Sequence, residues 1–436
     1  MKKIIIILFV FTLIFTMFSC ADKTETVNLV NPTNGGSDNN NTVNNNVSDN
    51  DSTPDSKTDS NSPEDSVIPD DKNDELSQIE QINYSPSISV SQYHNLATKN
   101  DGSLWAWGWN YYGQLGDGTT DRQSIPVKIM DGVMAACAGD NHSLAIKSDG
   151  SLWTWGLNNY GQLGDGTTED KLTPIKIMDD VTAVNAGGGY SLAIKSDGSL
   201  WTWGLNYYGR LGDGTTEDKL TPIKIMDDVK EAIAGNKHSL AIKNDGSLWA
   251  WGNNNFGSLG DGTIGTNESK STPVKIMDDV IAISAGGQNN GDHSFAIKSD
   301  GSLWAWGNNS YGQLGNGEIK DYNPTPVKIM DGVMAISAGD LHSFAIKNDG
   351  SLWGWGNNSG GRLGDGTFTI PDKENNDKTT PIKIMDDVTA ISAGPHSLAI
   401  KNDGSLWVWG INMYGSLGDG TDEDRETPVK IMDGMN

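Results

Sequence analysis

Cysteine and histidine are scarce in this chain, and clusters of positive charge are absent. Two of its 436 residues are cysteines and six are histidines. No basic run occurs anywhere, and the formal net charge is −26. This charge disfavours contact with phosphate backbones, so we do not expect the chain to bind nucleic acid. No helical periodicity of apolar residues is present, which leaves β-strands as the expected elements.

Residues 1–20 have the features of a secretory signal. Two lysines precede an apolar run over residues 4–18, and Cys20 follows directly after a serine. A basic start before an apolar core is typical of signal peptides. The position of Cys20 resembles the lipobox of bacterial lipoproteins, which implies that its thiol is acylated and becomes the mature N-terminus. An ordinary signal peptide or an uncleaved anchor is the alternative.

With Cys20 acylated, no disulfide can form within the chain, and burial and strand pairing must hold the fold. The second cysteine, Cys137, occupies the place in its repeat that Ser337 takes in another. We therefore expect a buried, unreactive thiol at this position.

Residues 21–85 are expected to form a disordered acidic tether. They are rich in Asn, Asp, Ser and Thr and contain no Trp or Phe. Such a segment cannot bury enough apolar surface to offset the entropy of ordering. As a flexible coil it would span about 45 Å, enough to hold a domain away from a membrane. The tether contributes −11 and the signal +2 to the net charge, which leaves −17 for residues 86–436.

A hairpin pattern recurs seven times in residues 86–436. Its cleanest copy, residues 142–156, reads H-S-L-A-I-K-S-D-G-S-L-W-T-W-G. Asp-Gly between two β-prone runs is a strong hairpin signal. Two registers are possible: a two-residue turn pairs Ile146 with Trp153, and a type I turn with a bulge at Gly150 shifts the pairing by one residue. The Trp-x-Trp pairs recur at steps of 48 to 55 residues, which indicates a repeat architecture.

Each repeat is expected to supply four short strands. In the second repeat they cover residues 133–138, 142–147, 151–156 and 173–178, and the last contains Pro174. Proline suits an edge strand, so this strand is predicted to be outermost and the first one innermost. Seven such units predict an all-β, seven-bladed β-propeller of four-stranded antiparallel blades over residues 86–436.

The repeated pattern also identifies a family. The sequence G-x-x-H-S-L-A-I-x-x-D-G-S-L-W-x-W-G-x-N-x-Y-G-Q-L-G-D-G resembles the regulator of chromosome condensation repeat, whose family folds as a seven-bladed propeller. The resemblance covers residues 87–436. The Trp-Asp signature of WD repeats and the Gly-Gly doublet of kelch repeats are both missing from the sequence.

Residues that recur at one position of every repeat are expected to serve the blade. All six histidines share one such position, and Tyr190 takes it in the third repeat, which would interrupt a central ring of metal ligands. The aspartates of the L-G-D-G-T loops lack the D-x-D-x-D-G spacing of calcium loops, so they are predicted to shape turns. Loop aromatics such as Tyr112 and Tyr414 are predicted to pack. We expect neither a metal nor a cofactor.

Binding is expected where the repeats differ. The variable segments are residues 263–271, 288–292, 318–323 and 368–379, and all are first or third loops of their repeats, which lie on one face of an antiparallel blade. Trp109 is the one tryptophan outside the pairs, and Tyr111 and Tyr112 follow it. The candidate binding residues are Trp109, Tyr111, Tyr112, Glu268, Asn289, Asp292, Phe368 and Lys373.

These features favour a non-catalytic, monomeric propeller displayed on the bacterial cell envelope. It would bind a protein or a surface polymer through one loop face and reach the membrane only through its lipid anchor. The alternative is inhibition of a cell-wall enzyme such as a β-lactamase. The family resemblance also implies nucleotide exchange on a small GTPase, and some propellers are lyases or hydrolases. No histidine outside the repeat pattern and no converging acid pair supports catalysis.

Overall fold

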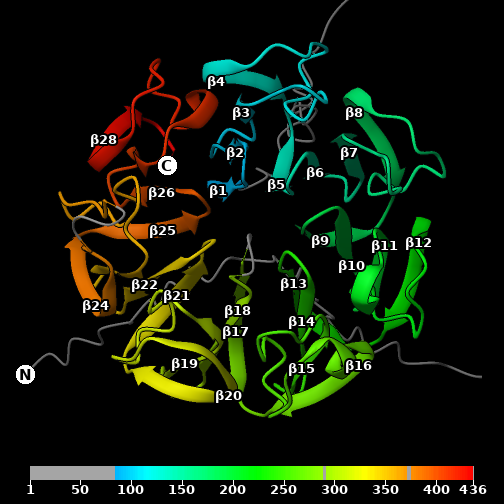
Figure 1. The fold of residues 1–436 in the computed structure, drawn as a ribbon. Helices are drawn as coiled ribbons and strands as arrows, with labels where there is room; N and C mark the ends of the chain where they lie inside the picture. Colours follow the sequence, from blue (N-terminus) through cyan, green and yellow to red (C-terminus); the bar gives the residue numbers. More distant parts are fainter. Residues whose placement is uncertain (1–83, 288–290, 371–374, 436) are drawn as a thin grey trace, which may run out of the picture. The chain divides into compact units, whose positions relative to one another are not determined.

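The computed structural model describes residues 84–287, 291–370 and 375–435. The predicted signal, Cys20 and the tether up to residue 83 lie outside these residues. The described chain forms seven four-stranded antiparallel sheets, each built from strands that are consecutive in the sequence. Figure 1 shows the sheets arranged as blades around a central axis, which confirms the predicted seven-bladed propeller. No helix in the described chain is long and apolar enough to cross a membrane.

The strands fall into four classes, counted outward from the axis, and their order confirms the predicted innermost and outermost strands. The inner strands are β1 (Ser87–Val90), β5 (Val133–Ala138), β9 (Val181–Ala186), β13 (Val229–Ala234), β17 (Val280–Gly286), β21 (Val333–Ala338) and β25 (Val388–Ala393). The second strands are β2 (His94–Thr98), β6 (His142–Lys147), β10 (Tyr190–Lys195), β14 (His238–Lys243), β18 (His293–Lys298), β22 (His342–Lys347) and β26 (His396–Lys401).

The other two classes complete each blade. The third strands are β3 (Leu104–Gly108), β7 (Leu152–Gly156), β11 (Leu200–Gly204), β15 (Leu248–Gly252), β19 (Leu303–Asn309), β23 (Leu352–Gly356) and β27 (Leu406–Gly410). The outer strands are β4 (Gln123–Met130), β8 (Lys171–Met178), β12 (Lys219–Met226), β16 (Lys270–Met277), β20 (Lys320–Met330), β24 (Lys378–Met385) and β28 (Arg425–Met432). Short 3-10 helices in the described chain are η1 (Tyr207–Gly209), η2 (Thr266–Glu268) and η3 (Met413–Gly415).

The hairpin adopts the bulged register of the two that the sequence allows. Ile146 pairs with Leu152, and Ala145 pairs with Trp153. Gly150 has a φ of +77°, the left-handed conformation that glycine adopts without strain. Asp149 Oδ1 then accepts hydrogen bonds from the backbone N–H and the hydroxyl of Ser151, at 2.9 and 2.5 Å. The aspartate therefore fixes the turn from inside.

The outer strands are longer than predicted. β8 begins at Lys171 rather than at Thr173, and Pro174 lies within it, at a shift of register against β7. Proline is tolerated there because an outer strand has no partner on one side and a bulge releases its neighbours from pairing. The variable segment 318–323 likewise belongs mostly to a strand, since β20 begins at Lys320.

The second tryptophan of each pair fills a junction between blades. Trp155 is 0% exposed and belongs to one apolar cluster with Leu104 and Leu115 of the preceding blade. Trp153 packs half-buried against the same cluster, as the two-residue spacing predicts. Gly116 of the preceding blade lies against the Trp155 ring: a Cβ there would come within 2.7 Å of Nε1.

A hydrogen-bonded relay crosses each junction beside the tryptophan. Ser143 on β6 and Trp155 on β7 both donate to the carbonyl oxygen of Gln114 in the preceding blade, at 2.8 and 2.9 Å. Because the Ser143 proton is used in this bond, Ser143 Oγ accepts from His94 Nε2, 2.7 Å away. Tyr190 replaces histidine in the third blade, and its hydroxyl reaches the next serine in the same way. The histidines are thus structural, as predicted.

Burial keeps these imidazoles neutral. His94, His142, His238 and His396 are buried, and desolvation lowers the pKa of each to about 3. A charged imidazole at these junctions would lose its hydration without gaining a carboxylate partner.

The inner strands are linked around the axis by bonds from side chain to backbone. Ser89 Oγ on β1 accepts from the N–H of Ala138 on β5 at 3.0 Å. Cys137 holds the equivalent position on β5. It is half-buried, not fully buried as predicted, and desolvation raises the pKa of its thiol. On β13 the acceptor is the buried Glu231 instead. Desolvation raises the pKa of this carboxyl to about 8, although a bond from the Ile283 N–H opposes the shift.

The ring closes where the last blade, β25–β28, meets the first blade, β1–β4. This junction is here called the seam, and no strand is shared across it. Asn95 takes the place of the serine: its Oδ1 lies 2.7 Å from His396 Nε2, and its Nδ2 donates to the Ser416 carbonyl at 2.6 Å. Met435 follows the last strand and is fully buried in the apolar cluster of the seam. These side chains and one backbone hydrogen bond, from the Gly420 N–H to the Ser124 carbonyl at 3.0 Å, join the last blade to the first.

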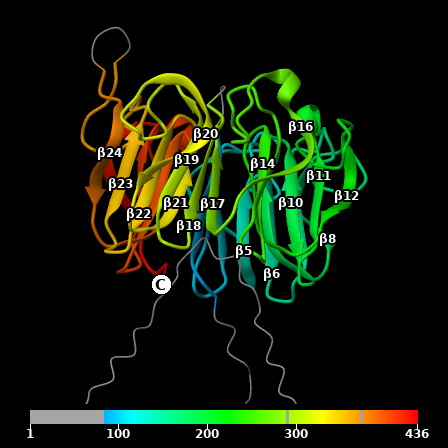
Figure 2. The ribbon, with the colours of Figure 1, turned by 90° about the horizontal axis from the view of Figure 1, so that it is seen from below.

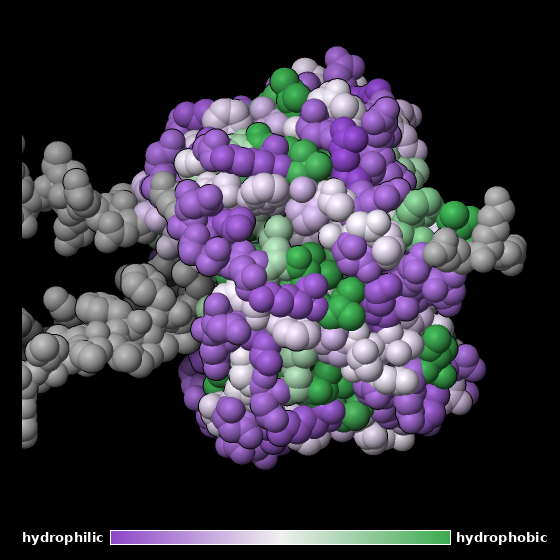
Figure 3. Space-filling model, turned by 90° about the vertical axis from the view of Figure 1, so that its left-hand side faces the viewer, coloured by the Kyte–Doolittle hydropathy of each residue, from purple (hydrophilic) through white to green (hydrophobic). Residues whose placement is uncertain are grey.

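The rim of the propeller is mostly hydrophilic where it is visible. Figure 3, which views it from the side of β24 and β28, shows hydrophobic residues in small separate patches. Lysines of the outer strands form ion pairs with the following links, for example Lys383 with Asp386 at 2.7 Å. Such exposed pairs contribute little stability but keep the strand edges hydrated.

Replacing Gly116 by alanine should destabilise the propeller more than replacing Gly118. Both glycines have a φ near +80°, at +81° and +83°, so both variants incur backbone strain of about 1–2 kcal/mol. An added Cβ meets the buried Trp155 only at Gly116; at Gly118 the nearest atom is 3.7 Å away. Overpacking should cost Gly116→Ala about 1–3 kcal/mol more in urea unfolding. Equal losses would contradict the close packing at this junction.

Acidification should weaken the fold through its histidines. Folding lowers the pKa of the buried histidines, so as the pH falls the unfolded chain takes up protons at a higher pH than the folded chain does. This stability is complete above about pH 6.5 and is lost as the pH falls, by up to about 1.4 kcal/mol per pH unit for each histidine. Three buried carboxyls act in the opposite direction: burial raises the pKa of Glu231 to about 8 and those of Asp292 and Asp340 to about 6. The variant His142→Tyr isolates one histidine: urea unfolding between pH 6.5 and 5 should show a shallower dependence, and an unchanged slope would refute the argument.

Candidate functional site

The antiparallel blades place the variable loops on one side of the propeller, here called the loop face. It consists of the loops between first and second strands and between third and fourth strands. The Asp-Gly turns and the links between blades lie on the opposite turn face. Figure 2 shows the long connections before β16, β20 and β24 on the same side. For the described residues, the prediction of a single variable face is confirmed.

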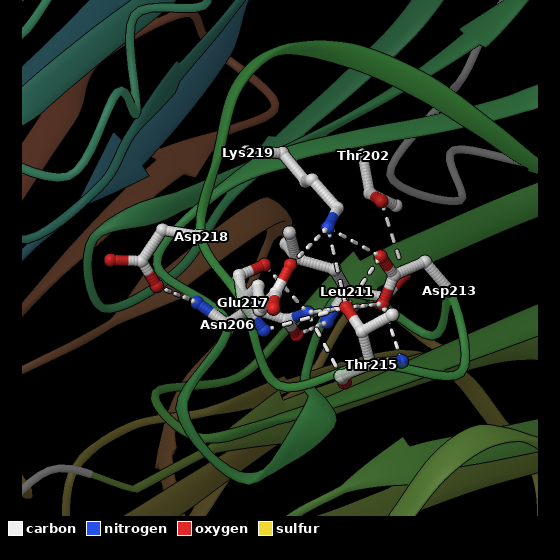
Figure 4. A network of polar contacts seen from close by, with 8 residues as sticks. All are labelled: Thr202, Asn206, Leu211, Asp213, Thr215, Glu217, Asp218 and Lys219. Atoms are coloured by element: carbon white, nitrogen blue, oxygen red, sulfur yellow. Dashed lines mark hydrogen bonds and ion pairs between the residues drawn. The ribbon is translucent and has the colours of Figure 1, made fainter.

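The L-G-D-G-T loops of this face are turns held by their aspartates. Asp213 Oδ1 accepts from the Thr215 N–H at 3.0 Å and from Asn206 Nδ2 at 3.0 Å, and Lys219 Nζ lies 3.1 Å from Oδ2 (Figure 4). Burial opposes ionisation, but these donors outweigh it and lower the pKa of Asp213. The carboxylate is thus bound by the protein's own donors, as the predicted turn role requires. In the described chain, no group of three or more His, Cys, Asp or Glu side chains could hold a metal ion.

An aromatic cluster lies on the loop face at the seam. It consists of Tyr93, Trp109, Tyr111, Tyr112 and Tyr414, and is here called the seam cluster. The Trp109 ring lies 4.4 Å from that of Tyr414 and 6.0 Å from that of Tyr111, between ring centroids. Tyr112 packs edge-on against Tyr111 at 5.0 Å. Tyr111 is 63% exposed, so the cluster presents apolar surface to solvent.

The seam cluster contains the three aromatic residues that were predicted to lie together, and two more that were not predicted. Trp109, Tyr111 and Tyr112 lie together, as their adjacency in the chain implied. Tyr93 and Tyr414 join them only because the ring closes: Tyr414 comes from the last blade and faces Tyr93 at 6.5 Å. Tyr414 also has a φ of +62°, an unusual conformation for a non-glycine residue. Superposing the first repeat next to the last would have revealed this neighbour.

The other predicted residues do not join this cluster. Glu268 ends η2 in the blade β13–β16 and pairs with Lys270 at 3.2 Å. Phe368 is 37% exposed in the blade β21–β24. Asp292 departs from the expected surface contact: it directly precedes β18 and is 0% exposed. Asn289 and Lys373 lie outside the described residues.

The central axis opens on the loop face in a small cavity, here called the channel mouth. Its volume is about 90 Å³, and it is lined by the ends of the inner strands and the residues that follow them. Its charged lining side chains are Asp140 and Asp340, and Asn236 Nδ2 donates to Asp140 Oδ2 at 3.3 Å. Burial raises the pKa of Asp340 to about 6, although the nearby Arg362 opposes this shift.

Comparison with protein families agrees with this architecture. The family described as RCC1-like domain matches residues 87–290. Two descriptions of the regulator of chromosome condensation (RCC1) repeat match the remaining blades, one at residues 300–346, 349–400 and 403–436 and the other at 280–313 and 334–362.

Curated relatives share part of the propeller. The chain is 30% identical to the ultraviolet-B receptor UVR8 of Arabidopsis thaliana over 178 residues, which is 38% of each chain. It is 32% identical to the human E3 ubiquitin-protein ligase HERC2 over 183 residues, which is 38% of this chain but 4% of the ligase. The match therefore spans well under two thirds of either relative.

Solved structures show the same fold at low identity. Human WBSCR16 superposes with a TM-score of 0.66 at 23% identity and covers 76% of this chain and 94% of that one. Yeast RCC1 (Prp20), solved with Kap60 bound, gives 0.67 at 23% identity over 76% and 84%. From blade count, strand order and family match together, the chain is a seven-bladed propeller of regulator of chromosome condensation repeats.

Proposed function

We propose that this propeller is a non-catalytic binding module of the bacterial cell envelope and that the seam cluster is its principal contact for a protein partner. One observation carries the proposal: an aromatic cluster with a 63% exposed tyrosine lies on the face where the repeats diverge. Aromatic side chains near the centre of an interface supply much of its binding energy. A protein of the same fold, yeast RCC1 (Prp20), has been solved with the protein Kap60 bound.

The repeated polar residues support a role without catalysis. The histidines are buried, neutral and engaged across blade junctions. The loop aspartates are bound by threonine, asparagine and lysine donors. Neither set offers a proton acceptor or nucleophile next to an open pocket, which general acid–base chemistry requires.

The entry point of the chain supports display from a tether. Tyr84, the first described residue, lies against the Asp-Gly turn of the first blade, where a Cβ on Gly102 would meet its ring at 2.7 Å. This turn belongs to the turn face. The chain therefore enters the propeller on the face opposite the seam cluster.

Alanine substitution in the seam cluster should abolish partner capture. Trp109→Ala with Tyr111→Ala removes the stacked pair, and hot-spot losses of about 2 kcal/mol or more correspond to at least about 30-fold weaker binding. Crosslinking on intact cells, followed by identification of the captured protein, measures this loss. The matched control is Tyr160→Ala, a tyrosine that is 39% exposed in the third loop of the next blade. Capture by the double variant at the control level would refute the proposal.

The variant Cys20→Ser tests the envelope anchor separately. If the Cys20 thiol carries lipid, the serine variant should move from the membrane fraction to the soluble exported fraction, while the propeller keeps its thermal midpoint. A single acyl chain binds membranes reversibly, so two or more chains are needed for stable anchoring. Unchanged fractionation of Cys20→Ser, or lack of metabolic labelling with a fatty acid in the wild type, would remove the anchor and leave the binding proposal standing.

A further inference from the structure

The channel mouth contains a buried carboxylate that accepts no hydrogen bond from any described residue. Asp340 is 8% exposed and lines the cavity at the end of β21. Arg362 is near enough to influence it electrostatically, but no ion pair within 4 Å joins the two in the described chain. A carboxylate removed from water without a donor is costly unless a cation compensates it.

The surroundings of Asp340 are acidic as well. Asp140 is the other charged residue lining the cavity. On the same face, acidic residues recur at the exposed tips of third loops, at 169–170, 217–218 and 422–424. Clefts lined by charges of one sign concentrate ions of the opposite sign. The carboxylates that line the channel mouth therefore favour a cationic group there, although two arginines lie close by: Arg210 donates to the carbonyls of Gly188 and Asn236, and Arg362 influences Asp340.

The size of the cavity limits what can enter it. About 90 Å³ corresponds to roughly six water-sized volumes and is far below the volume of about 300 Å³ or more typical of small-molecule pockets. A narrow alkyl chain with a terminal ammonium group fits this space, and a planar ring system does not. The walls are glycine and alanine ends of the inner strands, which leave the axis open.

Tyr93 connects the channel mouth to the seam cluster. Its ring faces Tyr414 at 6.5 Å. Gln92, the residue directly before Tyr93 in the chain, lines the channel mouth. A partner on the seam cluster therefore has the channel mouth next to it.

We propose that the channel mouth receives a lysine side chain of the protein partner that docks on the seam cluster, with its ammonium group bound by Asp340. This inference rests on the proposed function, because it specifies a second contact on the same face. The lysine neutralises a buried charge at the centre of the ring, and the aromatic cluster supplies the apolar contact beside it.

Binding of a blocked pentalysine peptide to the full-length protein tests the site at low salt. The variant Asp340→Asn should weaken binding about tenfold, or about 1.4 kcal/mol, because a charge-assisted hydrogen bond is lost. Asp121→Asn is the matched control: it removes the same charge from an exposed position of the loop face and should change affinity by less than about twofold. The same peptide with acetylated lysines should not bind. Equal affinities of the two variants, or binding of the acetylated peptide, would overturn the inference.

Carbodiimide crosslinking of the wild-type protein to pentalysine provides a readout that does not depend on the folding of a variant. An amide bond between the peptide Nζ and the Asp340 carboxyl, located by mass spectrometry, is expected. Crosslinks confined to exposed carboxylates such as Asp121 would indicate non-specific attraction and refute the site. If Asp340→Asn captures the cellular partner as well as the wild type while the Trp109 variant does not, the lysine site fails and the proposed function stands.

Discussion

One carbonyl oxygen per blade junction holds the propeller together. The Gln114 carbonyl accepts from both Ser143 and Trp155 of the next blade, and the serine in turn accepts from His94. The described chain contains no disulfide, and no blade borrows a strand from its neighbour. These shared acceptors and the buried tryptophans therefore carry the cohesion of the ring. The constraint explains why serine, tryptophan and histidine recur together, and why asparagine can replace serine only where its amide both accepts and donates.

The same constraint separates structural residues from those available for binding. The polar side chains that recur from blade to blade are already engaged: the histidines at the junctions, and the aspartates in the Asp-Gly turns and in the third loops. Function is left to positions where the copies differ, and these lie on the loop face. The seam cluster and the channel mouth are neighbours there, because Tyr93 belongs to the cluster and the preceding residue, Gln92, lines the channel mouth.

Much of the fold follows from the sequence, because periodic tryptophans and Asp-Gly turns specify blades locally. The hairpin register did not follow, since both faces of the strands are buried and either pairing keeps apolar side chains inside. Asp292 was predicted to lie on the surface because its segment varies between repeats, but it is fully buried, and sequence variation alone does not determine exposure. Trp109 was recognised because it breaks the pattern. Its partner Tyr414 lies at the other end of the chain, and the channel mouth combines residues from every blade, so neither appears in any single repeat.

Each blade is one uninterrupted segment of chain, so the number of repeats can change during evolution without dividing a sheet. Duplication or loss of a whole copy would leave every remaining sheet intact, since no strand would be orphaned. The angle between neighbouring blades would have to change, and this change would be distributed over all the junctions of the ring. The aromatic grouping at the seam would survive such a change in copy number, because the first and last copies alone create it.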